Sequence, residues 1–566
     1  MKSLFKLLLL PLLFLAGCKK DNQYQTLTVT GMSSMAFASG DAISIYGSGF
    51  DTIPDNNTVS FDGVAGEVAT STPNRLQVIV PVLTGSGQIT VKTHGQSATS
   101  TQSYTLVNVL QGTYTNNLTL TPDKKYLIRG AVIFNAKLII QPGTVIYGEK
   151  LTHGSLTCND IDWQGTAAQP IVFTSDQAPG SRAPGDWGGI ITIQGGSQAN
   201  TNTPVPIGIM EYVRVEYAGY TATPAVRGQA LLLFTDQGSV MRYIQVSYSA
   251  GDGISTYEGV SNATFDYYLE HLIAFGCEGD DFRFTTAAGT VQYALGLKDP
   301  YLANSLQGNG ITISDPEASQ SPVVVSNFTL IGYDPAARNI AGGTGLPLTQ
   351  NAGRGVKVGD VLAEVNNNPQ APAPGSISTE SFAMYNSVIA GSWQAAVSIY
   401  GNPHSYYYPS DWDSYEDSAY ITTGGDIVSF RNNFITGTAG QALPYRGGVF
   451  GREAYTTTNY NFNGFEDISG TIQQQLFGYF NDTTRTMDLT AGQDPLGIKG
   501  LADYTQINHP TMLPAAGSPL LTGAVFGATT PANTPQLNKD ITYIGAFGTT
   551  DWTAGWSNFN PQQTKY

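Results

Sequence analysis

Short runs in which apolar and polar residues alternate recur along the N-terminal part of the chain, separated by turn residues. Residues 42–46 read Ala-Ile-Ser-Ile-Tyr and end at a Gly-Ser-Gly turn, and residues 75–80 read Arg-Leu-Gln-Val-Ile-Val. Alternation with a period of two places every second side chain on one face, which is typical of a half-buried β-strand. Similar runs occupy residues 58–61, 88–92 and 103–107, and Asp62-Gly63 is a hairpin signal. The pattern predicts a small β-sandwich over residues 26–107.

Farther along, the pattern changes into a loose repeat. Residues 211–217 read Glu-Tyr-Val-Arg-Val-Glu-Tyr, and residues 242–248 read Arg-Tyr-Ile-Gln-Val-Ser-Tyr. Val213 lies 31 residues before Ile244, which lies 28 residues before Leu272. Repeats of roughly 20–50 residues indicate solenoids, propellers or arrays, and these units are too short for a propeller blade of about 40 residues. A parallel β-helix with one repeat per rung fits them.

A second series predicts how the rungs stack. Residues 251–254, 279–282 and 308–311 each begin with Gly, carry Asp or Asn second and end with Ile or Phe, at spacings of 28 and 29 residues. In rungs about 4.8 Å apart, the apolar members would stack inside the coil; they are Ile254, Phe282 and Ile311. The polar members would form a ladder at a turn, a normal device of β-solenoids; they are Asp252, Asp280 and Asn309.

The N-terminus predicts a secretory signal peptide over residues 1–17. Two lysines precede an apolar run from Leu7 to Leu15, which is too short to span a bilayer. The chain contains no second apolar run of spanning length.

The end of this signal, Leu-Ala-Gly-Cys at residues 15–18, resembles the lipobox of bacterial lipoproteins. The resemblance implies that Cys18 is acylated, with palmitate among the expected chains, and that it becomes the mature N-terminus. Several acyl chains anchor a protein far more firmly than one chain does. The following Lys-Lys-Asp, residues 19–21, loosely resembles the signal that exports Bacteroidetes lipoproteins to the outer face of the outer membrane. Residues 18–25 would then be a linker.

The N-terminal domain resembles a known family. Residues 40–50 read Gly-Asp-Ala-Ile-Ser-Ile-Tyr-Gly-Ser-Gly-Phe, residues 59–63 read Val-Ser-Phe-Asp-Gly, and a strand ends over residues 78–81. This pattern is similar to the IPT/TIG family of immunoglobulin-like domains and covers residues 26–107. In surface lipoproteins such domains act as spacers or protein contacts, and a spacer is the expectation here.

The larger part of the chain resembles a group of Bacteroidetes lipoproteins with a right-handed parallel β-helix. The matching segments are residues 138–146, 170–175, 185–189, 545–548 and 551–556. The resemblance implies an all-β chain whose residues 108–566 form a pectate-lyase-like solenoid with a C-terminal cap. It implies fold and location, and it brings no activity. The match is weakest in the long loops near residues 334–380 and 400–425.

Composition excludes some functions. Charged residues make up only 12% of the 566 residues, while Gly (64), Tyr (31) and Phe (24) are plentiful, as in an extracellular β protein. The formal net charge of −16 argues against nucleic acid as a partner, because phosphates require basic patches. Cys158 shares a strand face with Leu156 and should be buried, and no disulfide with Cys277 is expected.

The acidic residues of the ladder are the first candidates for chemistry. Polygalacturonases with a β-helix fold use an Asp-Asp pair like Asp280-Asp281, but they also need Gly-His-Gly and Arg-Ile-Lys segments that this chain lacks. Lyases instead need a calcium site beside a base, for which Arg283 and Lys298 are available. Turn chemistry alone is the simpler interpretation.

A metal site is the sharper interpretation of the same ladder. Two carboxylates one rung apart repel unless solvent, a shared proton or a cation compensates. We therefore predict that calcium binds at Asp252, Asp280 and Asn309 if their oxygens converge. Asp281 should point to the opposite strand face and pair with Arg283.

An aromatic and acidic segment is the second candidate. Its aromatic members, which we take as candidate ligand-binding residues, are Tyr406, Tyr407, Tyr408, Trp412 and Tyr415. Exposed aromatic rings beside carboxylates are surfaces on which sugar rings stack. The alternative is a loop that folds back and covers the side of the solenoid, because Tyr and Trp readily cap apolar surface.

These observations favour a non-catalytic cell-surface lipoprotein that binds a glycan or another extracellular macromolecule. The expected partners are the outer membrane through the lipid anchor, a polysaccharide, and proteins at the surface. A polysaccharide lyase or hydrolase acting in a β-helix groove is the alternative, and a structural or adhesive surface protein is a third interpretation.

Overall fold

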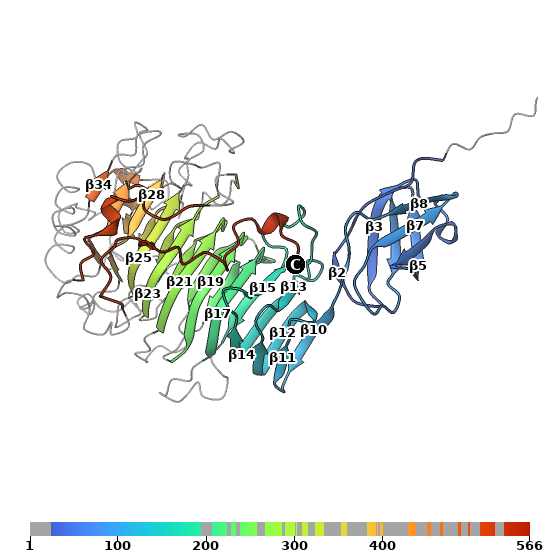
Figure 1. Ribbon diagram of the computed structural model, residues 1–566, viewed down its shortest axis with the longest axis horizontal. Coiled ribbons are helices and arrows are strands. Elements are labelled where there is room, and N and C mark those ends of the chain that lie inside the picture. Colours follow the sequence, from blue (N-terminus) through green and yellow to red (C-terminus); the bar gives the residue numbers. More distant parts are fainter. Residues whose placement is uncertain are drawn as a thin grey trace, which may run out of the picture. The chain divides into compact units, whose positions relative to one another are not determined.

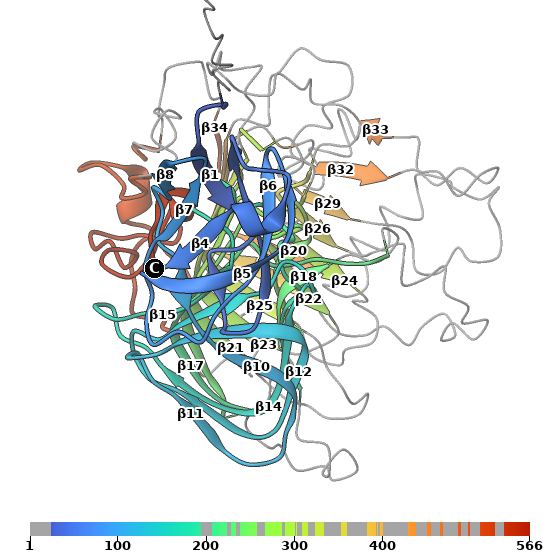
Figure 2. The same ribbon diagram turned by 90° about the vertical axis from the view of Figure 1, so that its right-hand side faces the viewer.

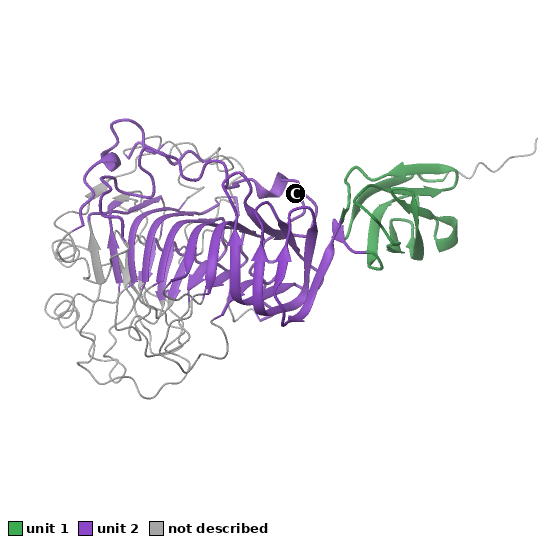
Figure 3. Ribbon diagram, turned by 60° about the horizontal axis from the view of Figure 1, so that its bottom comes forward, with its two compact units in different colours: residues 1–34, 39–105 green, residues 35–38, 106–566 purple. Residues whose placement is uncertain are grey.

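A computed structural model describes residues 24–193, 207–223, 228–233, 238–256, 267–285, 289–299, 301–302, 308–314, 323–332, 353–358, 382–391, 393, 397–399, 428–436, 450–453, 465–467, 485–487, 496–498, 510–526 and 537–566. The chain divides into two compact units (Figure 3). Unit 1 comprises residues 1–34 and 39–105, and unit 2 comprises residues 35–38 and 106–566. Among the described residues, no helix is long and apolar enough to cross a membrane.

Unit 1 is an antiparallel, immunoglobulin-like β-sandwich. Its strands pair in the order β1-β3-β6-β5-β4-β7-β8. Their bounds are β1 Thr28–Met32, β3 Ala42–Ser48, β4 Thr58–Phe61, β5 Val64–Thr72, β6 Arg75–Ile79, β7 Ile89–Thr93 and β8 Gln96–Thr99. Asp62 and Gly63 join β4 to β5 with φ of 46° and 89°, which confirms the predicted hairpin turn. The apolar residues of the alternating runs are buried in the interior of the sandwich; Ile45 and Val78, for example, have no exposed surface. A 3-10 turn covers Pro54–Asn56. β2 (Ala36–Phe37) belongs to unit 2 and forms a separate two-stranded sheet with β9 (Thr105–Leu106), whose two residues lie on either side of the boundary between the units in the sequence.

Unit 2 is a β-helix in which strands of successive rungs pair in parallel (Figures 1 and 2). The pairings arrange its strands in three rows, which we name by their order within a rung. The first row contains β11 Leu118–Leu120, β27 Phe382–Tyr385, β30 Val428–Arg431, and the N-terminal halves of five longer strands. These five are β17 Gly208–Glu216, β19 Val240–Ser247, β21 Tyr267–Phe275, β23 Gly289–Leu297 and β25 Val323–Gly332.

The second row contains the C-terminal halves of those five strands, with β13 Val145–Gly148, β15 Ile171–Ser175, β28 Val388–Gly391, β31 Phe434–Thr436 and β34 Arg485–Met487. The third row contains β16 Gly189–Thr192, β18 Gln229–Leu233, β20 Asp252–Thr256, β22 Phe282–Thr285, β24 Ile311–Ser314, β26 Val356–Val358, β29 Val397–Ile399 and β32 Phe450–Glu453. Three long strands of the first rungs bend through more than one row: β10 Asn108–Tyr114, β12 Lys125–Ile140 and β14 Ser155–Gln164. β33 Phe465–Asp467 pairs antiparallel with β32.

The predicted register is confirmed. Val213 pairs with Ile244, and Ile244 pairs with Leu272. In the third row Ile254 pairs with Phe282 and Phe282 with Ile311, and all three are buried in the apolar interior of the coil. Cys158 and Leu156 are buried in the same interior, and Cys158 and Cys277 are free thiols.

A sharp bend separates the first row from the second. In successive rungs the bend residue has positive φ: Tyr212, Tyr243, His271, Tyr293, Asn327, Asn386 and Asn432. Positive φ is uncommon for a tyrosine. Here the rings stack on one another, with centroids 4.4 Å apart for Tyr212 and Tyr243 and 4.5 Å apart for Tyr243 and His271. We call the first four residues of this series the aromatic column.

Candidate functional site

The ladder predicted at the start of the third-row strands is present. Oδ1 of Asp252 accepts a hydrogen bond from the backbone N–H of Asp280 at 2.8 Å. Oδ1 of Asp280 accepts one from the N–H of Asn309 at 3.0 Å, and Oδ1 of Asn309 accepts one from the N–H of Arg354 at 2.9 Å. Each side chain therefore holds the backbone of the next rung. This is the structural role that turn chemistry assigns to such residues.

A guanidinium compensates the two carboxylates of the ladder. Nη1 of Arg283 lies 3.0 Å from Oδ2 of Asp280, and Nε lies 3.8 Å from Oδ2 of Asp252. Both aspartates are fully buried, and the Arg283 side chain is 14% exposed. The expected pairing of Arg283 with Asp281 is wrong, because β22 begins at Phe282 and places Arg283 on the outer side, above Asp280.

Asp281 instead points into the coil and pairs with Lys298. Oδ1 of Asp281 lies 2.9 Å from Nζ of Lys298, which also donates to the carbonyl of Gly279 at 3.0 Å. Burial raises the pKa of Asp281 to about 7, and the charge of Lys298 opposes that rise. Gly296 leaves room for the carboxylate, because a Cβ there would lie 2.8 Å from its Oδ2. This buried pair occupies the interior, where a macromolecular substrate has no access.

The three residues predicted to bind calcium are adjacent, but their oxygens do not converge. Asn309 turns its Nδ2 toward Oδ1 of Asp280, at 2.9 Å, and its own oxygen toward Arg354. In the part of the chain that the structure describes, no group of three His, Cys, Asp or Glu side chains is placed to hold a metal ion. Calcium binding stays a prediction, and the Arg283 guanidinium already provides a cation at this place.

Two further predicted sites lie outside the described residues. They are the lipidation site Cys18 and the aromatic segment with Tyr406, Tyr407, Tyr408, Trp412 and Tyr415. Lipid attachment and ligand binding at these residues stay predictions.

Sequence reasoning missed the aromatic column. A signal was visible, because Tyr212 and Tyr243 occupy the same place in the two aligned repeats. Ring centroids in the column are 4.4–4.7 Å apart, so the ring faces cover one another and offer no platform for a sugar. Burial in the column lowers the pKa of His271 to about 4.

Comparisons with known proteins agree with the fold. Residues 27–107 match the IPT/TIG domain family, and residues 112–367 match the pectate-lyase-like β-helix domain family. Both resemblances predicted from the sequence are thereby confirmed at the level of the domains. No curated protein matches the chain.

Similar solved structures come from Bacteroides. They include an auxiliary nutrient binding protein from Bacteroides thetaiotaomicron VPI-5482 (14% identity, TM-score 0.14, covering 16% of this chain and 24% of that one). A second is an auxiliary nutrient binding protein from Bacteroides ovatus ATCC 8483 (16% identity, TM-score 0.14, covering 14% and 21%). A third is a Bacteroides thetaiotaomicron protein of unknown function (21% identity, TM-score 0.15, covering 15% and 22%). The chain spans less than a quarter of each of these structures, and a likeness at this level carries no functional argument.

Proposed function

We propose that the chain is a non-catalytic cell-surface lipoprotein that binds a glycan or another extracellular macromolecule. The observation that supports this best is that the polar groups of the ladder at the start of the third-row strands are engaged within the fold. Its carboxylates are bonded to backbone N–H groups and to Arg283, and both aspartates have no exposed surface.

Catalysis at the ladder would require groups that reach a substrate. A general acid or base must lie within hydrogen-bond distance of the proton that it transfers. Asp252 and Asp280 are fully buried and paired, and Arg283 is held between two carboxylates that stabilise its charged form. These residues stabilise the rungs and do not reach a substrate. We therefore favour ligand binding over catalysis as the function.

We assign glycan binding to the aromatic segment with Trp412 and Tyr407. Tyr and Trp combine a broad apolar face with a polar edge, which suits a sugar ring. The aromatic column does not compete for this role, because its ring faces are already covered. Attachment through Cys18 would present this segment outside the cell.

A lyase or hydrolase is the second candidate, and one observation favours it. Arg283 lies on the outer side of the third row beside two carboxylates, and Lys357 occupies the same column two rungs later. In a lyase, a neutral Lys or Arg side chain takes a proton from the sugar ring, so Arg283 would first have to lose its own proton, which the two carboxylates oppose. This candidate requires the ladder to open toward solvent.

A glycan array with the soluble chain, residues 19–566, tests the proposal. We expect binding to one class of glycan that is lost in the double variant Trp412→Ala/Tyr407→Ala and kept in Tyr301→Ala, a variant of an exposed tyrosine outside the segment. Binding that the double variant retains would remove the aromatic segment from the site. If the array shows no bound glycan, glycan binding is excluded for the glycans on it, and an extracellular protein becomes the ligand class to test.

A further inference from the structure

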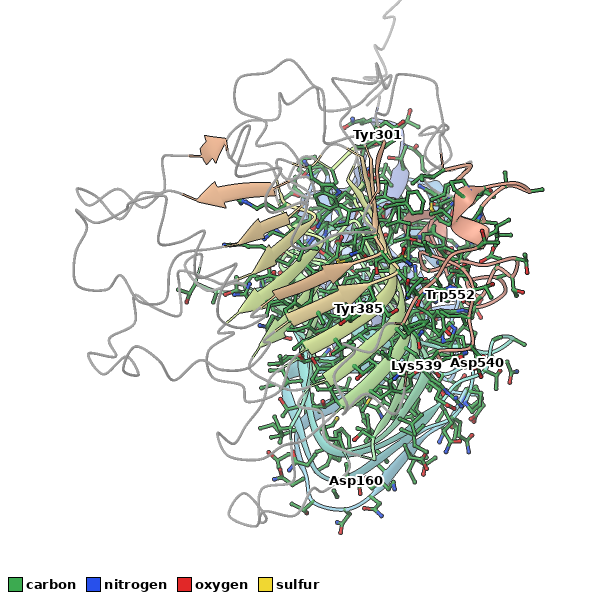
Figure 4. All side chains as sticks on the ribbon, turned by 90° about the vertical axis from the view of Figure 1, so that its left-hand side faces the viewer. Asp160, Tyr301, Tyr385, Lys539, Asp540 and Trp552 are labelled. Atoms are coloured by element: carbon green, nitrogen blue, oxygen red, sulfur yellow. The ribbon has the colours of Figure 1, made fainter. Side chains whose placement is uncertain are left out.

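The C-terminal segment, residues 537–566, returns along the side of the coil. In Figure 1 it runs from the late rungs past β25 and β17 to an end beside β13. The labelled Lys539, Asp540 and Trp552 lie on one side of the coil in Figure 4. This side is the outer surface of the second row and of the bend, and we call it the docking face.

Two glutamines of the docking face, one on β19 and one on β23, form hydrogen bonds with the backbone of the segment. The side-chain amide of Gln245 accepts from the N–H of Asn558 at 2.8 Å and donates to its carbonyl at 2.8 Å. Gln292 does the same for Asn538, at 2.9 and 3.1 Å. Pairing with both backbone groups of one residue imitates the two bonds of a neighbouring strand. These contacts engage the backbone of Asn558 and Asn538 and not their side chains.

The docking face is apolar where an exposed sheet would carry polar residues. Ile273, Phe275, Leu295 and Leu297 point outward and are fully buried. They form one cluster with Ile544, Phe547, Trp556 and Phe559 of the segment and with Leu496, Ile498, Met512 and Leu520 of the preceding chain. Sheets with both faces apolar require a cover on each side. The segment provides part of that cover.

Two tryptophans of the segment pack their rings against the aromatic column. The Trp556 ring lies edge-on to Tyr212 and Tyr243, with centroids 5.9 and 6.0 Å apart. The Trp552 ring lies edge-on to His271 at 5.1 Å. Edge-to-face contacts of this kind add to the area that the rings bury.

The last residue of the segment enters a polar pocket. The hydroxyl of Tyr566 donates to the carboxylate of Glu216, whose oxygens lie at 2.5 and 2.6 Å, and Glu216 is buried. The guanidinium groups of Arg182 and Arg214 lie 5.1 and 5.7 Å from the centre of the ring. Arg182 also donates to the carbonyls of residues 561 and 564. The pocket recognises both the ring and the hydroxyl of a tyrosine.

We propose that the docking face is a segment-capture site, which residues 537–566 fill in the same chain and which the same segment of a second copy fills in exchange. Every contact described above is non-covalent, and residues 527–536 connect the segment to the preceding chain. An exchanged segment would make the same contacts, which is why such swaps need little additional free energy. This inference does not depend on glycan binding.

A nicked full-length protein tests the proposal. A protease site placed within residues 527–536 allows cleavage after folding, and a fluorescent synthetic peptide of residues 537–566 then serves as the segment of a second copy. We expect the cleaved segment to stay bound through gel filtration and to exchange with excess labelled peptide, followed by fluorescence anisotropy. A nicked protein that never takes up the labelled peptide would overturn the proposal.

Variants of the coil show whether the amide contacts of Gln245 and Gln292 contribute to binding of the segment. The double variant Gln245→Leu/Gln292→Leu should release the labelled peptide about 10- to 100-fold faster, as expected for the loss of several buried hydrogen bonds. Gln164→Leu is the matched control, because the Gln164 side chain is exposed and bonds to Asp162. A release rate equal to that of the control would contradict a backbone-reading site.

Changes in the peptide leave the folded coil untouched. A labelled peptide with Tyr566→Phe should bind at least about tenfold more weakly, because it lacks the charged hydrogen bond to Glu216. A peptide with Lys539→Ala, a change at an exposed residue, should bind as the natural peptide does. Equal affinity of the Tyr566→Phe peptide and the natural peptide would exclude the tyrosine pocket from recognition.

Discussion

Replacement of Lys298 by Met should change how the stability of the coil depends on pH. Lys298 is the cation that faces Asp281, at 2.9 Å, and both side chains are buried. Burial raises the pKa of Asp281 to about 7, and Lys298 limits the rise. Without the ammonium group, the folded-state pKa of Asp281 should rise further, because Lys298 is the charge that lowers it, while the charges of Asp280 and Asp252 raise it.

The sign follows from the raised pKa. A carboxyl group with a folded-state pKa above its unfolded value, about 3.9, stabilises the fold below pH 4 relative to higher pH. In the wild type this stability is lost as the pH rises from about 4 through about 7, and the contribution of Asp281 levels off within about one pH unit above its folded-state pKa. In Lys298→Met the loss should continue above pH 7 at about 1.4 kcal/mol per pH unit. Between pH 7 and pH 9 the variant should therefore lose up to about 3 kcal/mol more than the wild type.

Urea denaturation at pH 6, 7, 8 and 9, followed by circular dichroism, measures this difference. Apart from Lys298 itself, which the double variant described next also lacks, the titrating groups are shared by the two proteins and cancel in the comparison. The double variant Lys298→Met/Asp281→Asn is the control, and its profile should run parallel to that of the wild type above pH 7. Parallel profiles for the wild type and for Lys298→Met would refute the assignment of Asp281 as a buried carboxyl compensated by Lys298.

Three further predictions concern the anchor, the ladder and the aromatic segment. Cys18→Ser should release the protein from membranes, because the acyl chains are the expected apolar anchor; fractionation with the outer membrane after a salt wash would contradict the lipid attachment. Calcium should raise the melting temperature of Arg283→Ala more than that of the wild type, because the substitution removes the positive charge that lies beside Asp252 and Asp280; equal calcium responses in thermal melts would exclude a competition between calcium and Arg283. Trp412→Ala/Tyr407→Ala should weaken glycan affinity by roughly 1–3 kcal/mol in titration calorimetry, the scale of ring-stacking anchors, and unchanged affinity would contradict their role.

Repetition explains why the rungs were predictable. Val213, Ile244 and Leu272 recur at nearly constant spacing, and a parallel coil places residues at that spacing over one another. The same argument located the ladder of Asp252 and Asp280. The hairpin at residues 62–63 was predictable because its turn chemistry is local.

The partner of Arg283 was not predictable from alternation alone. Asp281 lies in the turn before β22, where the period of two does not yet apply, so its side chain enters the coil and meets Lys298. The path of residues 537–566 was not predictable either. Contacts such as that between Gln245 and Asn558 join residues 313 positions apart and leave no local pattern in the sequence.

Product analysis with the glycan identified on the array tests the central claim most directly. The wild-type chain is incubated with that glycan at a concentration that saturates binding, and the oligosaccharides are analysed by mass spectrometry over a day. The account predicts bound glycan of unchanged length, both with calcium and with chelator. Shorter or unsaturated products that disappear in Arg283→Ala or Asp280→Asn would contradict it and identify the third row as a catalytic surface.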